Sequence, residues 1–317
     1  MSAGFRKYLT LFIKSAITVG VIGYLYHHLS SSAYELSDIW QLSWIPAICS
    51  AAMIPLNLGL EALKWRTMVR NFYPSTRFRD ACEAVLAGMT TGIFTPNRIG
   101  EYGGRIFLLP PGKRVEAAVL MFVDRICQMM VTLWMGAIAL AGFVLLKTDW
   151  DTGGKLLAIL AIVLISGLLI WLAFSRNYVI RLLSRYRRYK YLRKAHTTLE
   201  QLYPGLLGRV LLLSTLRYLV FTLQFVLLMY AYGYHQGFFM AVWMILLIYL
   251  LKSFAPSIAL SELGIRETIA IAVMNEFQVS QIISFNATFL LYLYNMALPS
   301  VLGMYLLPRM RIFGKRT

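Results

Sequence analysis

Two stretches of the sequence carry the same charged pattern, Glu-x-Gly-x-Arg, inside long apolar surroundings. In each copy the Glu and the Arg stand four residues apart, so on a helix they share one face and can form an ion pair. Pairing lowers the cost of holding a charge inside a bilayer, which for an unpaired group is about several kcal/mol. Ionisable residues at such depth are candidates for function, here the binding of a charged group. The two copies are Glu101, Gly103 and Arg105, and Glu262, Gly264 and Arg266.

A proline precedes each copy of the pattern, Pro96 before the first and Pro256 before the second. Proline cannot donate a backbone hydrogen bond and disfavours helix in the preceding residue, so each predicts a helix break. The free N–H groups at the start of the next helix, together with the positive end of its dipole, form a site for an anion. Arginine guanidinium groups suit phosphate oxygens. The residues expected to bind substrate are Arg98, Glu101, Arg105, Asp124, Arg125, Glu262, Arg266 and Glu267, and those expected at helix breaks are Pro96, Gly100, Gly103, Gly104, Pro256 and Gly264.

A purely structural interpretation of the same residues is also open. The two Glu–Arg pairs would then close two hairpins as internal salt bridges, with Gly100-x-x-x-Gly104 as a notch for helix packing. Asp124 and Arg125 lie near the start of a predicted span, where they either reach the membrane surface or line a cavity. A further charged group ends another predicted span, and we expect it to anchor the helix rather than to perform chemistry. That group is Glu61, Lys64, Trp65 and Arg66.

The elements that must position these residues are membrane helices. The chain has 317 residues, of which 59% are hydrophobic and 14% charged, and its mean hydropathy is +0.64. This composition predicts an all-α polytopic membrane protein and excludes a separate globular domain, so residues 1–317 form a single transmembrane domain. The windows long enough, or nearly so, to cross about 30 Å of hydrocarbon are 9–29, 43–63, 116–146, 155–174, 210–232, 237–254 and 281–307.

Loop charges predict the orientation of these helices. Lys and Arg gather at both termini and in segments 64–79, 113–114 and 176–209, whereas the connections at 30–42, 147–154, 232–236 and 275–280 are poor in them. By the positive-inside rule, the basic segments and both termini are cytoplasmic. We expect a multi-pass protein of the cell inner membrane.

Two helical hairpins complete the predicted fold. Stretches 81–95 and 97–109 lie between two cytoplasmic segments, which indicates a re-entrant hairpin that turns near Pro96. Stretches 237–254 and 257–277 connect two outer loops, which indicates a second hairpin from the other side. Residues 1–150 and 155–317 then each consist of two spans, a hairpin and a span. The sequence therefore predicts an inverted-topology repeat with about six full spans plus the two hairpins.

Other chemistries find little support in the sequence. The formal net charge is +17, which in a membrane protein indicates loops on anionic lipid rather than nucleic-acid binding. The four histidines lack the spacing of a zinc site, and no phosphate-cradling nucleotide motif is present, so we expect no metal, no cofactor and no enzymatic activity. A basic segment mixed with Leu and Tyr indicates an interfacial helix on anionic lipid. Its cations are Arg181, Arg185, Arg187, Arg188, Lys190, Arg193 and Lys194.

The charged motifs resemble one known family in order and position. They are Pro96-Asn-Arg98-Ile-Gly100-Glu101 with Arg105, then Asp124-Arg125, then Pro256 followed by Glu262-Leu-Gly264-Ile-Arg266-Glu267, and they cover most of the chain. This order is similar to the flippase-like family built on the transmembrane region of lysylphosphatidylglycerol synthase, although 257–261 is poorer in glycine than in many relatives. The resemblance implies an inner-membrane protein that moves a lipid between leaflets. Without an aminoacyl-transferring domain, the chain is not expected to make lysylphosphatidylglycerol.

We therefore expect a lipid flippase or transporter whose two hairpins meet near the midplane. Arginines would hold the phosphate of an anionic or aminoacylated phospholipid, while the glutamates orient the arginines or bind an amine. The two halves would rock to expose the site to each leaflet in turn. Two alternatives remain: an enzyme that acts on a lipid-linked substrate with Glu101 or Glu262 as the base, and a scaffold that recruits partners through 176–194.

Overall fold

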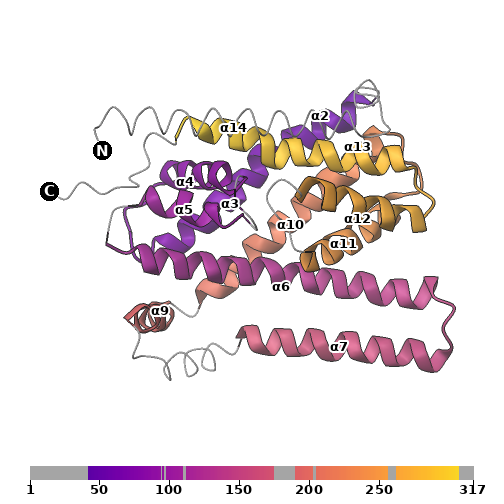
Figure 1. Ribbon diagram of the computed structural model, residues 1–317, viewed down its shortest axis with the longest axis horizontal. Coiled ribbons are helices and arrows are strands. Elements are labelled where there is room, and N and C mark those ends of the chain that lie inside the picture. Colours follow the sequence, from indigo (N-terminus) through magenta and orange to yellow (C-terminus); the bar gives the residue numbers. More distant parts are fainter. Residues whose placement is uncertain are drawn as a thin grey trace.

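The computed structural model describes residues 42–93, 95, 98–109, 112–174, 190–202, 205–255 and 262–306. Within these ranges the regular structure is helical, with no strand, as the composition predicts (Figure 1). Several predictions concern residues outside them. These are the first span at 9–29, both prolines of the predicted breaks, Pro96 and Pro256, and the basic residues Arg181, Arg185, Arg187 and Arg188.

Long apolar helices dominate the described part of the chain. Four helical stretches are long and apolar enough to cross a membrane, namely 44–69, 114–147, 205–231 and 281–304, and two shorter helical stretches, Thr152–Leu168 and Phe238–Phe254, are apolar as well. The chain is therefore a multi-pass membrane protein. The helices are α2 (Trp44–Ala52), α3 (Ile54–Val69), α4 (Phe78–Gly92), α5 (Gly100–Phe107), α6 (Arg114–Lys147), α7 (Thr152–Phe174), α9 (Lys190–Gln201), α10 (Gly205–Ala231), α11 (Phe238–Phe254), α12 (Glu262–Glu276), α13 (Gln281–Tyr292), the π segment η4 (Leu293–Ala297) and α14 (Leu298–Met304).

The span predicted at 43–63 is interrupted and longer than expected. Met53 separates α2 from α3, and Pro55 occupies the first turn of α3, where a missing N–H is tolerated. The helix then continues to Val69, six residues beyond the predicted end. The prediction placed the end before Lys64 because the base-rich segment 64–79 was assigned to the cytoplasm. In the structure Lys64 is buried and paired with acidic side chains, so it does not end the helix.

At the places of the two predicted hairpins the structure has two pairs of packed helices. The first consists of α4 and α5, with 15 and 8 residues, and the second of α11 and α12, with 17 and 15 residues. At about 1.5 Å per residue, each arm is shorter than the roughly 30 Å of a bilayer core. The turns that flank the first hairpin are joined by Lys113 Nζ, which donates to Phe72 O at 3.2 Å. Those that flank the second are joined by Gln236 Nε2 and Gln278 O at 3.5 Å.

The order of elements in the described part matches the predicted plan. In each half a span precedes a hairpin and another span follows it, with α3, α4–α5 and α6 in the first half and α10, α11–α12 and α13–α14 in the second. Figure 1 shows the turns beside α4–α5 at one end of the long axis and those beside α11–α12 toward the other. The inverted symmetry of the two halves and the re-entrant depth of the hairpins stay predictions.

Each hairpin has its own hydrophobic core. Around the first, Trp65 and Met68 of α3 pack with Leu120 of α6. Around the second, Met244 of α11 and Met274 of α12 pack with their neighbours from α10 and α13. One helical stretch connects the two regions, because α13 packs on α12 whereas α14 packs on α4.

The π segment η4 lies between α13 and α14 and ends two residues before Pro299. Proline has no N–H, and its ring clashes with the carbonyl four residues earlier, which here belongs to Asn295. A wider turn relieves that clash, and π segments of this kind occur often at functional sites. The turn leaves Asn295 buried, where it hydrogen-bonds Asn57 of α3.

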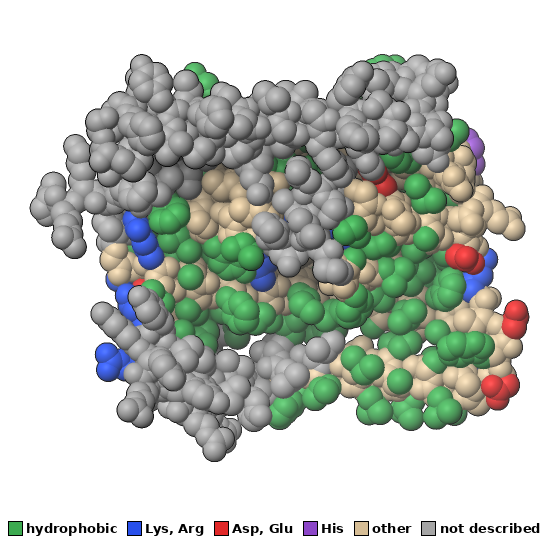
Figure 2. Space-filling view, in the orientation of Figure 1, with side chains coloured by type: hydrophobic (Ala, Val, Ile, Leu, Met, Phe, Trp, Pro, Cys, Tyr) green, Lys and Arg blue, Asp and Glu red, His purple; other side chains and the backbone are tan. Residues whose placement is uncertain are grey.

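The surface matches a protein embedded in lipid. Figure 2 shows apolar side chains spread over the middle of one face, with acidic side chains at the end where α6 turns into α7 and most of the visible basic ones toward the opposite end. The lipid-facing character extends to α7, whose leucines 156, 157, 160, 164 and 168 are all exposed. The predicted orientation, with the basic end in the cytoplasm, stays a prediction.

Candidate functional site: a buried ionic cluster beside the first hairpin

The first copy of the charged pattern forms its predicted ion pair. Glu101 and Arg105 lie one turn apart on α5, and Arg105 Nη2 donates to Glu101 Oε1. Both side chains are almost completely buried. The guanidinium of Arg105 also lies over the ring of Trp65, with 5.6 Å from Cζ to the ring centroid. A full charge pair is therefore enclosed by α5 and α3.

Helix α3 contributes two further charges, which corrects a prediction. Glu61 and Lys64 were expected to anchor the end of a span, but both are buried in the interior. Glu61 Oε1 accepts from Arg105 Nη2 at 2.5 Å, and Lys64 Nζ lies 2.9 Å from Glu61 Oε2. The error follows from the early end assigned to this helix, since α3 continues to Val69 and carries both residues inward.

Helix α6 supplies Asp124 and Arg125, which the sequence assigned either to the surface or to a cavity. Asp124 is buried, and its Oδ1 lies 2.7 Å from Lys64 Nζ. Arg125 Nη2 pairs with Glu101 Oε2, and Arg98 Nη2 lies 3.4 Å from the same oxygen. Asp124 is ten residues into α6, about 15 Å from its first residue. The pair thus belongs to the interior group.

Helix α10 closes the group with Arg217, a residue that the sequence analysis missed. Arg217 Nη1 lies 2.9 Å from Glu61 Oε2, and its Nε donates to Asn57 Oδ1 at 2.9 Å. The amide of Asn57 uses both of its ends: Oδ1 accepts from Arg217, and Nδ2 donates to Asn295 Oδ1 on the π segment. The signal was available: Arg217 is an ionisable residue in the middle of a predicted span, and Asn57, Glu61 and Lys64 share one helix face.

The backbone of Arg98 has a conformation that is uncommon for residues other than glycine. Arg98 has φ 58°, in the left-handed region, which costs an L-residue about 1 to 2 kcal/mol. Such strain persists where the surroundings fix it, and it occurs often at binding sites. The conformation places Arg98 just before α5, where its guanidinium reaches Glu101.

The glycines of the first hairpin serve packing, as the structural interpretation proposed. A Cβ at Gly104 would overlap Thr91 Oγ1 and lie 2.5 Å from Ala87 O of α4, and a Cβ at Gly100 would overlap the Thr91 carbonyl. Gly103 differs, because its Cβ would meet only the Phe107 ring at 3.4 Å. The close contact of α4 and α5 therefore depends on Gly100 and Gly104, which hold Glu101 and Arg105 against the core.

Together these residues form what we call the ionic cluster, with more cations than carboxylates. Five basic and three acidic side chains give a formal net charge of +2. Most are nearly inaccessible, but Arg98 and Arg125 keep side-chain exposures of 20% and 35%. Among the described residues, Nε and Nη1 of Arg105 and Nε of Arg98 are buried without a hydrogen-bond partner. The cluster consists of Glu61, Lys64, Arg98, Glu101, Arg105, Asp124, Arg125 and Arg217.

An excess of guanidinium groups in apolar surroundings favours the binding of an anion. A buried charge is stable when it is paired and hydrogen-bonded, so a cluster with net positive charge favours an anion at its accessible side. Guanidinium donors bind phosphate oxygens in charge-assisted hydrogen bonds. Arg98 and Arg125 occupy that side, while the other members hold them in place.

The second copy of the pattern lies on α12 in a different environment. Arg266 is half-buried, and its Cζ lies 5.7 Å from the ring centroid of Tyr292 on α13. Glu267 is buried, and Gly264 lies in the first turn of the helix. Glu262 begins α12, but its side chain is outside the described part, so the predicted pair of Glu262 with Arg266 stays a prediction.

The remaining predicted residues have simpler surroundings. Lys194 of α9 lies 3.2 Å from Glu116 of α6 and donates to Gly112 O at 3.3 Å, while Arg193 is exposed. Lys194 therefore joins α9 to the start of α6. The three cysteines are free. Among the described residues no group of His, Cys, Asp or Glu has the arrangement of a metal site.

A bundle of membrane helices that encloses a cationic cluster defines a multi-pass membrane protein with a buried polar site. The chain belongs to the family described as the lysylphosphatidylglycerol synthase transmembrane region, whose family model matches residues 11–303. This confirms the resemblance noted from the charged motifs. No curated protein and no solved structure matches the chain.

Proposed function

We propose that this protein is a lipid flippase or transporter, which binds the phosphate of a lipid head group at the ionic cluster and moves the lipid between leaflets. The observation that carries the proposal is the net positive charge of a buried cluster with two partly exposed arginines, Arg98 and Arg125. Membership of a family named for a lipid synthase's transmembrane region supports lipid as the ligand class.

The partly exposed and the enclosed residues of the ionic cluster would have different roles. Arg98 and Arg125 would contact the phosphate, because their side chains keep access from outside the cluster. Glu101 pairs with both and would fix the distance between them. The fully enclosed members would keep the site preorganised, so that the arginines need little reorganisation when the anion arrives.

The second hairpin would serve the opposite leaflet. Arg266 and Glu267 on α12 would contact the head group when the halves rock, with Glu262 as the expected partner of Arg266. The bundle would lie in the cell inner membrane with both termini in the cytoplasm. The cargo would be an anionic or aminoacylated phospholipid, and the protein would leave it chemically unchanged.

Translocation of a fluorescent anionic phospholipid in proteoliposomes tests the proposal. Each contact between a charged donor and an anion contributes about 1.5 to 3 kcal/mol, so R98Q/R125Q should lower the rate by about tenfold or more. R98K/R125K should recover part of it, because lysine keeps the charge but not the bidentate geometry. R79Q is the matched control, since Arg79 is an arginine with 82% side-chain exposure outside the cluster.

Two results would overturn this assignment. One is an undiminished rate in R98Q/R125Q protein that is correctly folded and reconstituted in equal amount. The other is chemical conversion of the lipid, detected by mass analysis of the recovered lipids, which would favour an enzyme that acts on a lipid-linked substrate.

A further inference from the structure

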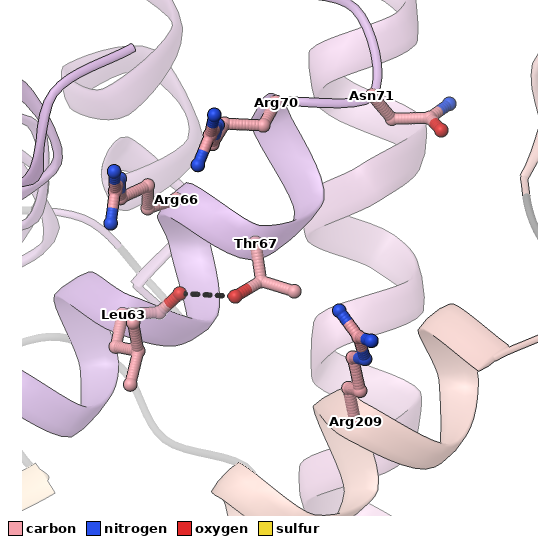
Figure 3. A pocket seen from close by; sticks show the side chains of 6 residues that line it. All are labelled: Leu63, Arg66, Thr67, Arg70, Asn71 and Arg209. Carbon is pink, nitrogen blue, oxygen red and sulfur yellow. Dashed lines mark hydrogen bonds between the residues drawn. The ribbon is translucent and has the colours of Figure 1, made fainter. Parts of the chain in front are cut away.

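Helix α10 runs antiparallel to α3, and the two helices meet in different ways along their length. Where α3 ends and α10 begins, they flank an open cavity of about 450 Å³. Figure 3 shows Arg66 and Arg70 of α3 extending away from Arg209 of α10 at this open end. Deeper in the bundle, Arg217 Nε of α10 donates to Asn57 Oδ1 of α3 at 2.9 Å. The contact of the two helices therefore has a polar centre of its own, away from the cavity.

The amides at this polar centre have one arrangement of donors and acceptors. Asn57 Nδ2 donates to Asn295 Oδ1 on η4, and Asn295 Nδ2 donates to Leu291 O at 3.2 Å. Because arginine can only donate, Asn57 must turn its oxygen to Arg217, which fixes the orientation of both amides. Both asparagines are buried. Buried amides with both ends bonded hold their partners in one geometry.

Arg217 is the first cation in a chain of alternating charges that crosses the ionic cluster. Arg217 Nη1 lies 2.9 Å from Glu61 Oε2, and Glu61 Oε1 accepts from Arg105 Nη2. Arg105 pairs in turn with Glu101, whose other oxygen holds the two partly exposed arginines. The chain thus connects the π segment η4 with the proposed contacts of the lipid phosphate.

A displaced Arg217 would change the pairing along this chain. Its guanidinium is held at Nε by Asn57 and at Nη1 by Glu61. Without the bond at Nε, the long side chain can turn away from Glu61, and that carboxylate then attracts Arg105 more strongly. Arg105 compensates Glu101 less, so Glu101 competes better with a ligand for the two partly exposed arginines.

A second buried polar contact joins α10 to α2, seven residues further along both chains. Gln224 Nε2 donates to Ser50 O at 3.1 Å, and Ser50 Oγ donates to Gln224 O at 3.2 Å. Both of these side chains are buried, as Asn57 is. Their bonds end on backbone carbonyls, whereas the bonds of Asn57 and Arg217 lead to Glu61. The two contacts therefore differ in whether they reach the ionic cluster.

We propose that Asn57 and Asn295 are positioning residues for lipid binding. They hold Arg217 against Glu61, and this pairing keeps the two partly exposed arginines available for the phosphate. The inference rests on the proposed function, because its ligand is the phosphate of a lipid at the ionic cluster. It adds the π segment between α13 and α14 to the parts of the protein that form the lipid site.

Binding of short-chain phosphatidylglycerol to the full chain in detergent, measured as Kd by titration calorimetry, tests this role. N295L removes both hydrogen bonds of the side chain at similar volume and should raise Kd by about threefold to tenfold. In R217Q protein, N295L should raise Kd by less than about twofold, because the arginine that Asn295 helps to position is absent.

Milder variants and matched controls accompany N295L. In N295T the hydroxyl can still bond the carbonyl four residues earlier but falls short of Asn57, so Kd should rise as in N295L. N57D keeps an acceptor for Arg217 and should bind the lipid more tightly than N57L. S50A/Q224M removes the other buried contact, and R66Q removes an arginine at the open end of α3. Both should leave Kd unchanged.

R98Q/R125Q separates this inference from the proposed function. If R98Q/R125Q leaves Kd unchanged, the ionic cluster does not bind the lipid, and both proposals are wrong. If R98Q/R125Q raises Kd but folded N295L and N295T do not, only the positioning role is wrong. Equal effects of N295L with and without Arg217, or an equal effect of S50A/Q224M, would also overturn that role, because they would indicate general loosening of the bundle.

Discussion

The two helical hairpins carry the same Glu-x-Gly-x-Arg pattern but lie in different surroundings. Around α5, helices α3 and α6 bring charged partners to the pattern, and Arg105 has two carboxylates within ion-pair distance, Glu61 and Glu101. Around α12, Arg266 lies over an aromatic ring, and the core of that region is apolar. Around α5 the pattern is only part of the ionic cluster. The site depends on Glu61, Asp124 and Arg217, which come from helices far away in sequence.

The largest expected difference between the hairpins concerns stability. Arg105→Ala leaves Glu61 and Glu101 with less compensation in the interior and should cost about 3 to 5 kcal/mol of unfolding free energy. The contact of Arg266 over Tyr292 contributes about 0.5 to 2 kcal/mol, so Arg266→Ala should cost at least that much. Denaturant unfolding in detergent measures both. Equal losses would mean that the two hairpins bury their charges alike.

A double-mutant cycle on Lys64 and Asp124 examines how the cluster is held together. Each single change, K64M or D124L, leaves a buried charge with one partner fewer and should cost about 3 to 5 kcal/mol. The double variant K64M/D124L should recover a large part, because the changes remove both charges of one pair. Unfolding free energies of the four proteins give the coupling. Additive losses would show that the pair does not act as a unit.

The contact between α4 and α5 should depend on Gly104 and not on Gly103. Gly104→Ala forces a methyl group against Thr91 and the Ala87 carbonyl, and should destabilise by about 1 to 3 kcal/mol. Gly103→Ala meets only the Phe107 ring at contact distance and should be neutral or stabilising by up to about 1 kcal/mol. Thermal shifts of the two variants provide the comparison. A similar shift in both would contradict the assigned notch.

The smallest effect is expected for an ion pair outside both hairpin cores. Arg79 and Glu83 lie 3.2 Å apart on the surface of α4, where solvent screens them. Arg79→Ala should change the unfolding free energy by no more than about 0.5 kcal/mol. The change should shrink further in high salt. If Arg79→Ala lowered the unfolding free energy as much as Arg105→Ala, burial could not explain the larger effect expected at Arg105.

Local spacing predicted one ion pair of the cluster correctly. Glu101 and Arg105 are one turn apart, so their pairing follows from the helix period alone. Arg125 was included because an arginine inside a span is costly without a role. The sequence also predicted both hairpins as pairs of short helices, from the apolar stretches between loops of known charge.

The rest of the site depends on contacts that local patterns do not contain. Lys64 and Glu61 were assigned to a helix end because charges usually mark such ends, yet mutual pairing removes the cost that the rule assumes. Glu61 and Arg105 are 44 residues apart, and Asn57 and Arg217 are 160 apart. Only the packing of α3 against α10 and the first hairpin brings them together.

The π segment at the centre of the last helical stretch has a consequence that concerns insertions and deletions. A π turn holds about one residue more than the α turn that it replaces. Deletion of a single codon within 293–297 would restore an ordinary helix there. Helix α14 would then turn by about 100° relative to α13. Gly303, which now lies so close to α4 that a Cβ would overlap the Leu86 carbonyl, would point elsewhere. The one extra residue of the π turn therefore sets the rotation of α14, which packs on the first hairpin, relative to α13, which packs on the second.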